Sequence, residues 1–233
     1  MKNVAIIPAR GGSKGIIRKN VKNLCGKPLI AWTIEDALSS SNIDSVYVST
    51  DCPEISAIAK SYGAEVPYLR PSNLSGDNCT TESAITHFCE WSIKKHIEID
   101  RIVLLQPTSP IRMSSSINAA ISYFEKNACD SLLGVCESHR FFWSKKLEDN
   151  LAASYDFMNR PRRQDIMIHD KKYLENGSIY ISDFKGYMSH KNRLFGKIGM
   201  YEMQEIESHE IDTETDFIVC EALIHSLKKR EIK

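Results

Sequence analysis

Short apolar runs alternate with longer segments of helical periodicity through the first half of the chain. Short apolar runs bounded by polar loops are typical of buried strands, whereas apolar positions three or four apart indicate the inward side of a helix. We therefore predict strands at residues 4–7, 45–49, 101–105 and 131–135. Helices are predicted between and after them, at residues 28–39, 53–62, 82–96 and 114–126.

The pattern weakens after residue 139, where the chain becomes polar, aromatic and basic. Further strands are predicted at residues 179–181 and 200–203, and a last helix at residues 215–229. The sequence contains no internal repeat, low-complexity tract or interdomain linker. These features predict a single domain over residues 1–233, with residues 139–200 forming an insertion or dimerisation lobe within it.

This order of elements predicts an α/β fold with a mainly parallel, Rossmann-like sheet and helices on both faces. Ligands of such sheets bind outside the carboxyl ends of the strands. The loops at residues 8–20, 49–51 and 106–112 each follow a predicted strand. We therefore expect these three loops to meet at one edge of the sheet.

Composition and charge narrow the classes of partner and compartment. Thirty Lys and Arg residues balance thirty Asp and Glu residues, so nothing favours nucleic acid or an anionic membrane in general. The seven cysteines are scattered without a C-x-x-C pair, which is typical of reduced thiols. No apolar stretch is long enough for a signal peptide or a membrane span. We expect a soluble cytoplasmic protein that binds neither nucleic acid nor a membrane.

The loop after the first strand carries the clearest chemistry. Four cations lie within ten residues: Arg10, Lys14, Arg18 and Lys19. The loop also holds Gly11, Gly12 and Gly15, and glycines let a backbone approach a ligand and turn N–H groups toward anions. Its spacing matches neither a Walker A loop nor G-x-G-x-x-G. A flexible solvated loop is the alternative, but a phosphate site, such as one for a triphosphate, is favoured.

An ordered series of segments resembles the CMP-sialic acid synthetase (acylneuraminate cytidylyltransferase) family. The segments are residues 6–20, 26–29, 48–51 (Val-Ser-Thr-Asp), 69–71, 104–110 (Leu-Leu-Gln-Pro-Thr-Ser-Pro), 161–164, 176–180 (Asn-Gly-Ser-Ile-Tyr) and 211–214. Each is weak alone, but together they cover nearly the whole chain. The resemblance implies a nucleotidyltransferase that joins CMP from CTP to the anomeric 2-hydroxyl of a nine-carbon nonulosonic acid and releases pyrophosphate.

The resemblance also implies roles for individual residues. Arg10 and Lys19 would be catalytic, with Lys19 stabilising the transition state at the α-phosphate. The nucleotide site would comprise Arg10, Gly11, Gly12, Ser13, Lys14, Lys19, Asn20, Arg70 and Thr81. The sugar site would comprise Gln106, Arg162 and Tyr180.

Two acids, Glu210 and Asp212, are the candidate ligands of a divalent metal, Mg²⁺ or Mn²⁺. Residues at i and i+2 of an extended segment point the same way. The family usually has aspartate where this chain has Glu210, so direct and water-mediated coordination both stay open. Helix capping by Asp212 and Thr213, just before the last predicted helix, is the alternative.

Oligomeric state and substrate are predicted from weaker features. Apolar side chains in the polar loop Arg193-Leu194-Phe195-Gly196 indicate a subunit contact, and the family implies a homodimer. The sugar could be N-acetylneuraminic, legionaminic or pseudaminic acid. Two alternatives remain: a cytidylyltransferase of the eight-carbon acid ketodeoxyoctonate, and a nucleotide-binding regulator without catalysis. Only Glu210 favours the regulator.

Overall fold

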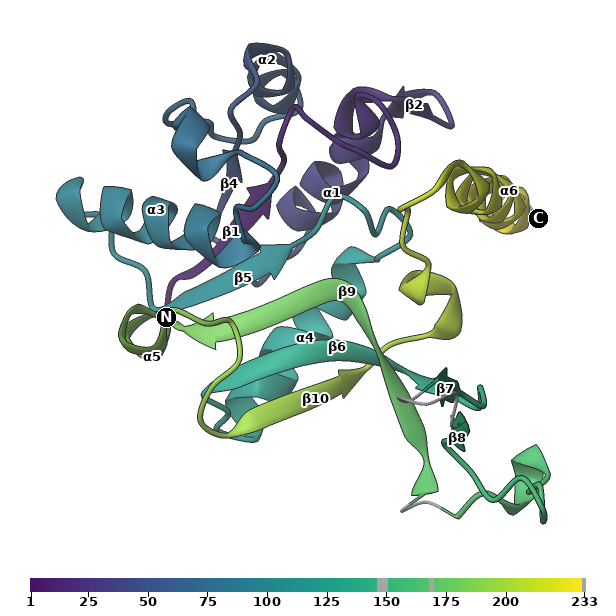
Figure 1. The fold of residues 1–233 in the computed structure, drawn as a ribbon. Coiled ribbons are helices and arrows are strands. Elements are labelled where there is room, and N and C mark those ends of the chain that lie inside the picture. Colours follow the sequence, from purple (N-terminus) through teal and green to yellow (C-terminus); the bar gives the residue numbers. More distant parts are fainter. Residues whose placement is uncertain (146–150, 168–169, 232–233) are drawn as a thin grey trace.

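The computed structural model describes residues 1–145, 151–167 and 170–231, and its centre is a six-stranded sheet (Figure 1). The strand order is β10 (Ile198–Glu202), β6 (Ser131–Ser138), β9 (Lys172–Asp183), β5 (Arg101–Leu105), β1 (Asn3–Pro8) and β4 (Ser45–Ser49). Within this sheet β9 runs antiparallel to both of its neighbours, while β1 pairs in parallel with β4 and β5, and β10 pairs in parallel with β6. The predicted mainly parallel α/β fold is confirmed.

Helices cover both faces of the sheet because β1 is apolar on both sides. Ala5 and Ile7 pack into one core with side chains of α1 (Leu29–Leu38), α2 (Pro53–Ser61) and α4 (Ser114–Lys126). Val4 and Ile6 pack into the other core with α3 (Thr81–Lys94) and α5 (Phe184–His190). A strand buried on both faces is typical of parallel sheets.

The remaining elements lie around the carboxyl edge and the lobe. Near the edge are η1 (Lys19–Val21), β2 (Asn23–Leu24), β3 (Lys27–Pro28), η2 (Ser72–Leu74) and η6 (Glu205–Ser208). The last helix, α6 (Glu214–Glu231), packs Phe217, Cys220 and Ile224 against Ile16 and Leu24. This third apolar cluster joins the end of the chain to the loop after β1. In the described part of the chain, no helix has the length and apolarity needed to cross a membrane.

A small lobe projects from one end of the sheet and contains β7 (Trp143–Lys145), β8 (Leu151–Ala153) and η4 (Arg163–Asp165) (Figure 1). It contains fewer residues than the predicted lobe at residues 139–200, because most of β9, α5 and β10 belong to the main body. Residues 146–150 and 168–169 of the predicted lobe lie outside the described residues.

The loop Arg193–Gly196 does not expose the apolar surface that the sequence suggests. Phe195 is 8% exposed, and its ring stacks on His190 of α5 with ring centroids 4.7 Å apart. Leu194 packs against the same core. The expected exposure of these apolar side chains is therefore wrong, because they pack into the chain's own core, and a subunit contact at this loop stays a prediction without that support.

Candidate functional site

The loops that follow β1 and β5 meet at the carboxyl edge of the sheet, as expected, and enclose a cavity of about 410 Å³. Segments near residues 70–81 and 210–212 complete its wall. Most of the predicted nucleotide-site residues line the cavity: Arg10, Ser13, Lys14, Lys19, Asn20, Arg70 and Thr81. Gln106, Glu210 and Asp212 line it as well. A volume of this size is typical of small-molecule sites.

Two cations of the first loop face an acid that the sequence analysis missed. Asp77 Oδ1 lies 3.1 Å from Arg10 Nη1, and Asp77 Oδ2 lies 3.0 Å from Lys14 Nζ. These contacts hold the pKa of the Asp77 carboxyl below its usual value, with the hydrogen bond from Lys14 the largest cause. A carboxylate therefore occupies the place where the two cations would meet an anionic ligand. Only the polar sequence Ser75-Gly76-Asp77 could have suggested it.

Lys19 lies deeper and joins the first loop to the segment before α6. Its Nζ donates to the carbonyl oxygen of Ile211 at 2.7 Å and to Asp212 Oδ1 at 3.1 Å. Its side chain is 13% exposed. The backbone of the first loop packs closely on the segment before α6, because a Cβ at Gly15 would overlap the Asp212 carbonyl oxygen. The fold thus places the predicted catalytic cation beside a predicted metal ligand.

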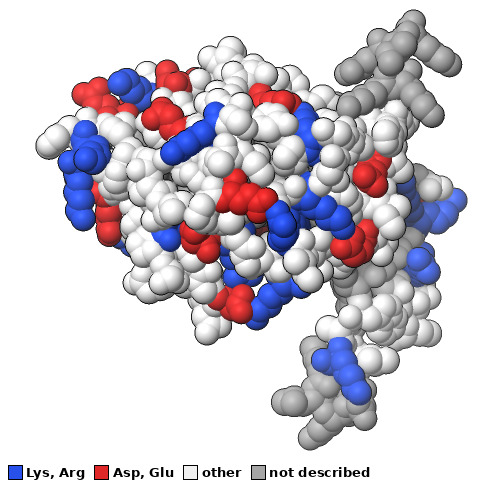
Figure 2. Space-filling view, turned by 90° about the horizontal axis from the view of Figure 1, so that it is seen from above, with Lys and Arg blue, Asp and Glu red and all other residues white. Residues whose placement is uncertain are grey.

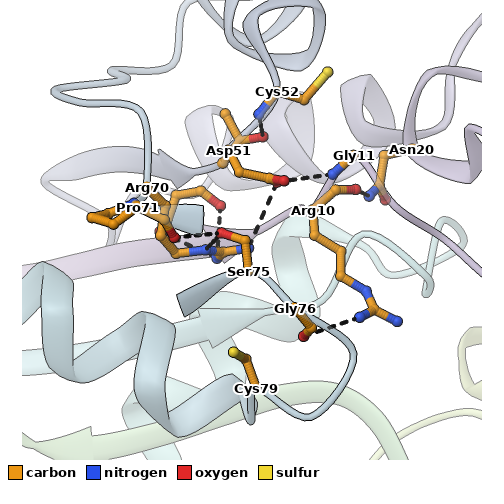
Figure 3. Close-up of polar contacts among 12 residues, drawn as sticks. Arg10, Gly11, Asn20, Asp51, Cys52, Arg70, Pro71, Ser75, Gly76 and Cys79 are labelled. Atoms are coloured by element: carbon orange, nitrogen blue, oxygen red, sulfur yellow. Dashed lines mark hydrogen bonds and ion pairs between the residues drawn. The ribbon is translucent and has the colours of Figure 1, made fainter. Parts of the chain in front are cut away.

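The glycines of the first loop are arranged differently from expectation. Gly11 and Gly12 are not among the residues that line the cavity. The Gly11 N–H donates to the carboxylate oxygen Asp51 Oδ1 at 2.9 Å, so it is turned toward the chain's own acid and not toward an anion in the cavity (Figure 3). The loop after β4 therefore lies behind the cavity and supports it.

Glu210 and Asp212 share one wall of the cavity. Thr108 Oγ1, another residue not predicted, donates to Glu210 Oε1 at 2.9 Å. Burial raises the pKa of the Glu210 carboxyl, and the neighbouring charge of Asp212 adds to this. A bound cation would relieve both effects.

Helix capping does not explain Asp212. Asp216 accepts hydrogen bonds from the backbone N–H groups of Asp212 and Thr213, and its own N–H donates to Thr213 Oγ1. Thr213 and Asp216 thus cap α6, and the Asp212 carboxylate remains in contact with Lys19.

The residues present fit a magnesium-type ion. Mg²⁺ commonly binds one or two carboxylates and takes further ligands from water and substrate phosphates. Among the described residues, no group of three or more His, Cys, Asp or Glu could hold a metal by itself. Glu210 and Asp212 would supply the hard oxygen ligands, with the phosphates of a nucleotide completing the shell.

Two predicted sugar-site residues do not reach this cavity within the chain. Tyr180 is 3% exposed, and its hydroxyl donates to Glu175 Oε1 at 2.5 Å. Arg162 lies on the lobe, where it pairs with Asp165 at 2.7 Å and lines a separate basic and aromatic groove with Arg140, Phe141, Arg160 and Arg163. Of the three predicted sugar contacts, only Gln106 faces the cavity.

Comparison with known proteins identifies a matching family and relatives of similar sequence. The profile of a family described as Cytidylyltransferase matches residues 4–231. N-acylneuraminate cytidylyltransferase B of Danio rerio is 39% identical over 221 residues, which are 93% of this chain and 50% of that protein. The chain thus spans about half the length of this relative. CMP-N,N'-diacetyllegionaminic acid synthase of Legionella pneumophila is 34% identical over 231 residues, covering 96% of this chain and 97% of that protein.

A solved structure shares the fold. CMP:2-keto-3-deoxy-manno-octonic acid synthetase, determined in complex with CTP, superposes with a TM-score of 0.70 at 17% identity. The match covers 97% of this chain and 99% of the other. At this identity the likeness establishes the architecture of the chain.

Proposed function

Because this chain belongs to the cytidylyltransferase family, we propose that it transfers CMP from CTP to the anomeric 2-hydroxyl of a nonulosonic acid and releases pyrophosphate. The observation that supports the proposal is the contact between Lys19 and Asp212 in one cavity, because a lysine beside a carboxylate would let a phosphate and a divalent metal bind side by side. The relatives of similar sequence, whose names specify acylneuraminic and legionaminic acids, support the nine-carbon sugar class.

The cavity supports this reaction by positioning and charge. The anomeric oxygen would form a bond to the α-phosphorus as the bond from that phosphorus to the pyrophosphate oxygen breaks, and the hydroxyl proton would pass to solvent water. Such a transfer depends on alignment and on neutralising the phosphate oxygens. Lys19 would stabilise the α-phosphate, and Arg10 and Lys14 would hold the β- and γ-phosphates after leaving Asp77. A metal on Glu210 and Asp212 would polarise the phosphate oxygens.

Product formation from a panel of sugars tests the proposal. The purified chain is incubated with CTP, Mg²⁺ and N-acetylneuraminic, legionaminic, pseudaminic or ketodeoxyoctonic acid, and pyrophosphate and product mass are measured. We expect a CMP conjugate with a nine-carbon acid. A conjugate with ketodeoxyoctonate alone would reassign the sugar, and CTP binding without pyrophosphate release from any acid would indicate a regulator.

We expect the reaction to require a divalent metal. Chelation should abolish pyrophosphate release, and Mg²⁺ or Mn²⁺ should restore it. Asp212→Asn should raise the Mg²⁺ concentration needed for half-maximal rate by at least about tenfold, because loss of even an outer partner of a metal ligand lowers metal affinity by about 10–100-fold. Asp216→Asn, which alters the α6 cap beside the site, is the matched control. Full activity in excess chelator would contradict the metal assignment.

We propose that the chain works as a homodimer whose lobe serves the neighbouring cavity. Arg162 lies outside this chain's own cavity, and the lobe exposes Phe142, Trp143, Leu151, Phe157 and Met158. An exposed apolar patch of this kind is typical of an interface. Light scattering should give the mass of a dimer. Mixing inactive Lys19→Ala and Arg162→Ala chains should restore part of the activity, whereas a fully active monomer would reject the proposal.

The partners and compartment in this proposal are those of a cytoplasmic enzyme acting on small molecules. Figure 2 shows basic and acidic side chains intermingled on the face it presents, unlike the single-sign surface expected for a protein that binds nucleic acid or anionic lipid.

All seven cysteines lie in the described residues, and none forms a disulfide. Thiol titration of freshly isolated protein should find them reduced, as in a cytoplasmic protein.

A further inference from the structure

Asp51 lies two residues after the end of β4, behind the wall of the cavity, and contacts two parts of the nucleotide site at once (Figure 3). Its Oδ1 accepts the hydrogen bond from the Gly11 N–H at 2.9 Å. The same oxygen lies 4.0 Å from Arg70 Nη2. Asp51 is not among the described residues that line the cavity, whereas Arg70 and Arg10, the neighbour of Gly11, are.

Both partners of Asp51 are held with little freedom. The Arg70 side chain is 4% exposed, and it donates to the Ser49 carbonyl oxygen at 3.2 Å and to Ser75 Oγ at 3.0 Å. A Cβ at Gly11 would lie 3.0 Å from Cys52 Cβ, so the first loop packs closely on the segment after β4. Moving the Asp51 carboxylate would therefore move the first loop, Arg70 or both.

We propose that Asp51 is a positioning residue that fixes the distance between Arg10, which the proposed function assigns to the nucleotide's phosphates, and Arg70, a second cation that lines the same cavity. One carboxylate oxygen holds the backbone of the first loop and faces the guanidinium of Arg70. The inference rests on the proposed function for the identity of the nucleotide. It assigns a role to the last residue of the Val48-Ser49-Thr50-Asp51 segment, to which the nucleotide chemistry gives no direct part.

A similar carboxylate at the opposite end of the same strand pair supplies a matched control. Asp44 Oδ2 accepts a hydrogen bond from the Asn3 N–H at 2.7 Å. Asp44 and Asp51 flank β4 at opposite ends, and each accepts a hydrogen bond from a backbone N–H in or near β1. Asp44, however, lies away from the cavity. Loss of either carboxylate should lower thermal stability, and only loss of Asp51 should disturb the nucleotide.

Calorimetric titration with CTP in the presence of Mg²⁺, together with initial rates, tests the inference. Asp51→Ala should raise the Kd and KM for CTP by about tenfold, the size of effect expected when a buried donor loses its partner, and leave the sugar KM within about twofold. Asp51→Asn keeps an acceptor for Gly11 but loses the charge facing Arg70, so we expect an intermediate Kd. Asp44→Ala should lower the Tm with the Kd for CTP unchanged.

Equal CTP affinity in the Asp51→Ala and Asp44→Ala chains would overturn the inference and leave the proposed function intact. An Asp51→Asn chain that binds CTP as tightly as the unsubstituted chain would overturn the coupling to Arg70. If the unsubstituted chain binds no CTP, the proposed function fails first, and the inference falls with it. Should Asp51→Ala fail to fold, the Asp51→Asn titration decides the question.

Discussion

Replacing Lys19 with alanine is expected to lower kcat by at least about a hundredfold while the chain stays folded. Lys19 Nζ lies at the floor of the cavity, 3.1 Å from Asp212 Oδ1, and its side chain is 13% exposed. A charge that is fixed before the reaction stabilises the developing transition state at no cost of reorganisation, and losing one such group lowers rates by about 10²–10³. Initial rates of pyrophosphate release at saturating CTP and sugar give kcat directly.

Lys22→Ala is the matched control for this prediction. Lys22 lies three residues further along, pairs with Glu214 at 2.5 Å and packs over the Phe217 ring, but it does not line the cavity. Its loss should affect stability slightly and kcat little. A Lys19→Ala chain with near-normal kcat would show that this lysine does not act at the α-phosphate. An effect confined to the KM for CTP would limit Lys19 to ground-state binding.

The central strands could be predicted from sequence because each is an apolar run buried on both faces. The predicted bounds of β4 and β5 match the structure. The first part of β9 was missed, since Lys172–Glu175 has no alternating or continuous apolar pattern and is largely exposed where it pairs with β6 beyond the sheet centre. The short helix α5 and the burial of Phe195 depend on each other, because the Phe195 ring packs against Gly186 of α5. No local pattern reports such a contact.

The same difference between local patterns and contacts of distant residues decides which parts of the candidate site could be predicted. The first loop could be predicted because its cations and glycines are adjacent in sequence. The pairing of Lys19 with Asp212 joins residues 193 positions apart and was not predicted, because the family resemblance gave the two residues only separate roles. Asp77 and Thr108 were missed because their partners are distant in sequence, and because the motif at residues 104–110 gave a role only to Gln106. Arg162 illustrates the limit of resemblance: a matching motif names a residue without showing which cavity it reaches.

Replacing Arg112 is expected to lower the free energy of unfolding more than any other substitution named above, because it would leave the buried Asp36 carboxyl without a nearby cation. Arg112 is 2% exposed, and its guanidinium donates to the Ser178 carbonyl oxygen at 2.6 Å and to Thr33 Oγ1 at 2.9 Å. Burial lowers the pKa of Arg112 to about 10, and the facing acids Asp36 and Glu207 oppose this shift. Burial also raises the pKa of Asp36 to about 7, against the lowering influence of Arg112.

Arg112→Met should therefore lower the free energy of unfolding by about 2–6 kcal/mol, because the buried Ser178 carbonyl oxygen and Thr33 Oγ1 each lose a donor, at a cost of about 1–3 kcal/mol apiece. The loss should grow with pH. The pKa of the Asp36 carboxyl is near its ordinary value of 3.8 in the unfolded chain and about 7 in the folded chain, so its contribution to stability is complete below pH 3.8 and is lost as the pH rises through 7. Without Arg112 the folded pKa rises further and this loss deepens.

Urea unfolding at about pH 5 and pH 8 measures both effects, with the linear dependence on denaturant giving each free energy. The control is the double substitution Asp36→Asn with Arg112→Met, in which the uncompensated carboxyl is gone. We expect this chain to recover part of the stability at pH 8 and to show a weaker dependence on pH, because no ionisable group remains at position 36. A loss in Arg112→Met below about 1 kcal/mol, or one equal at both pH values, would show that Asp36 does not depend on Arg112 for its charge balance.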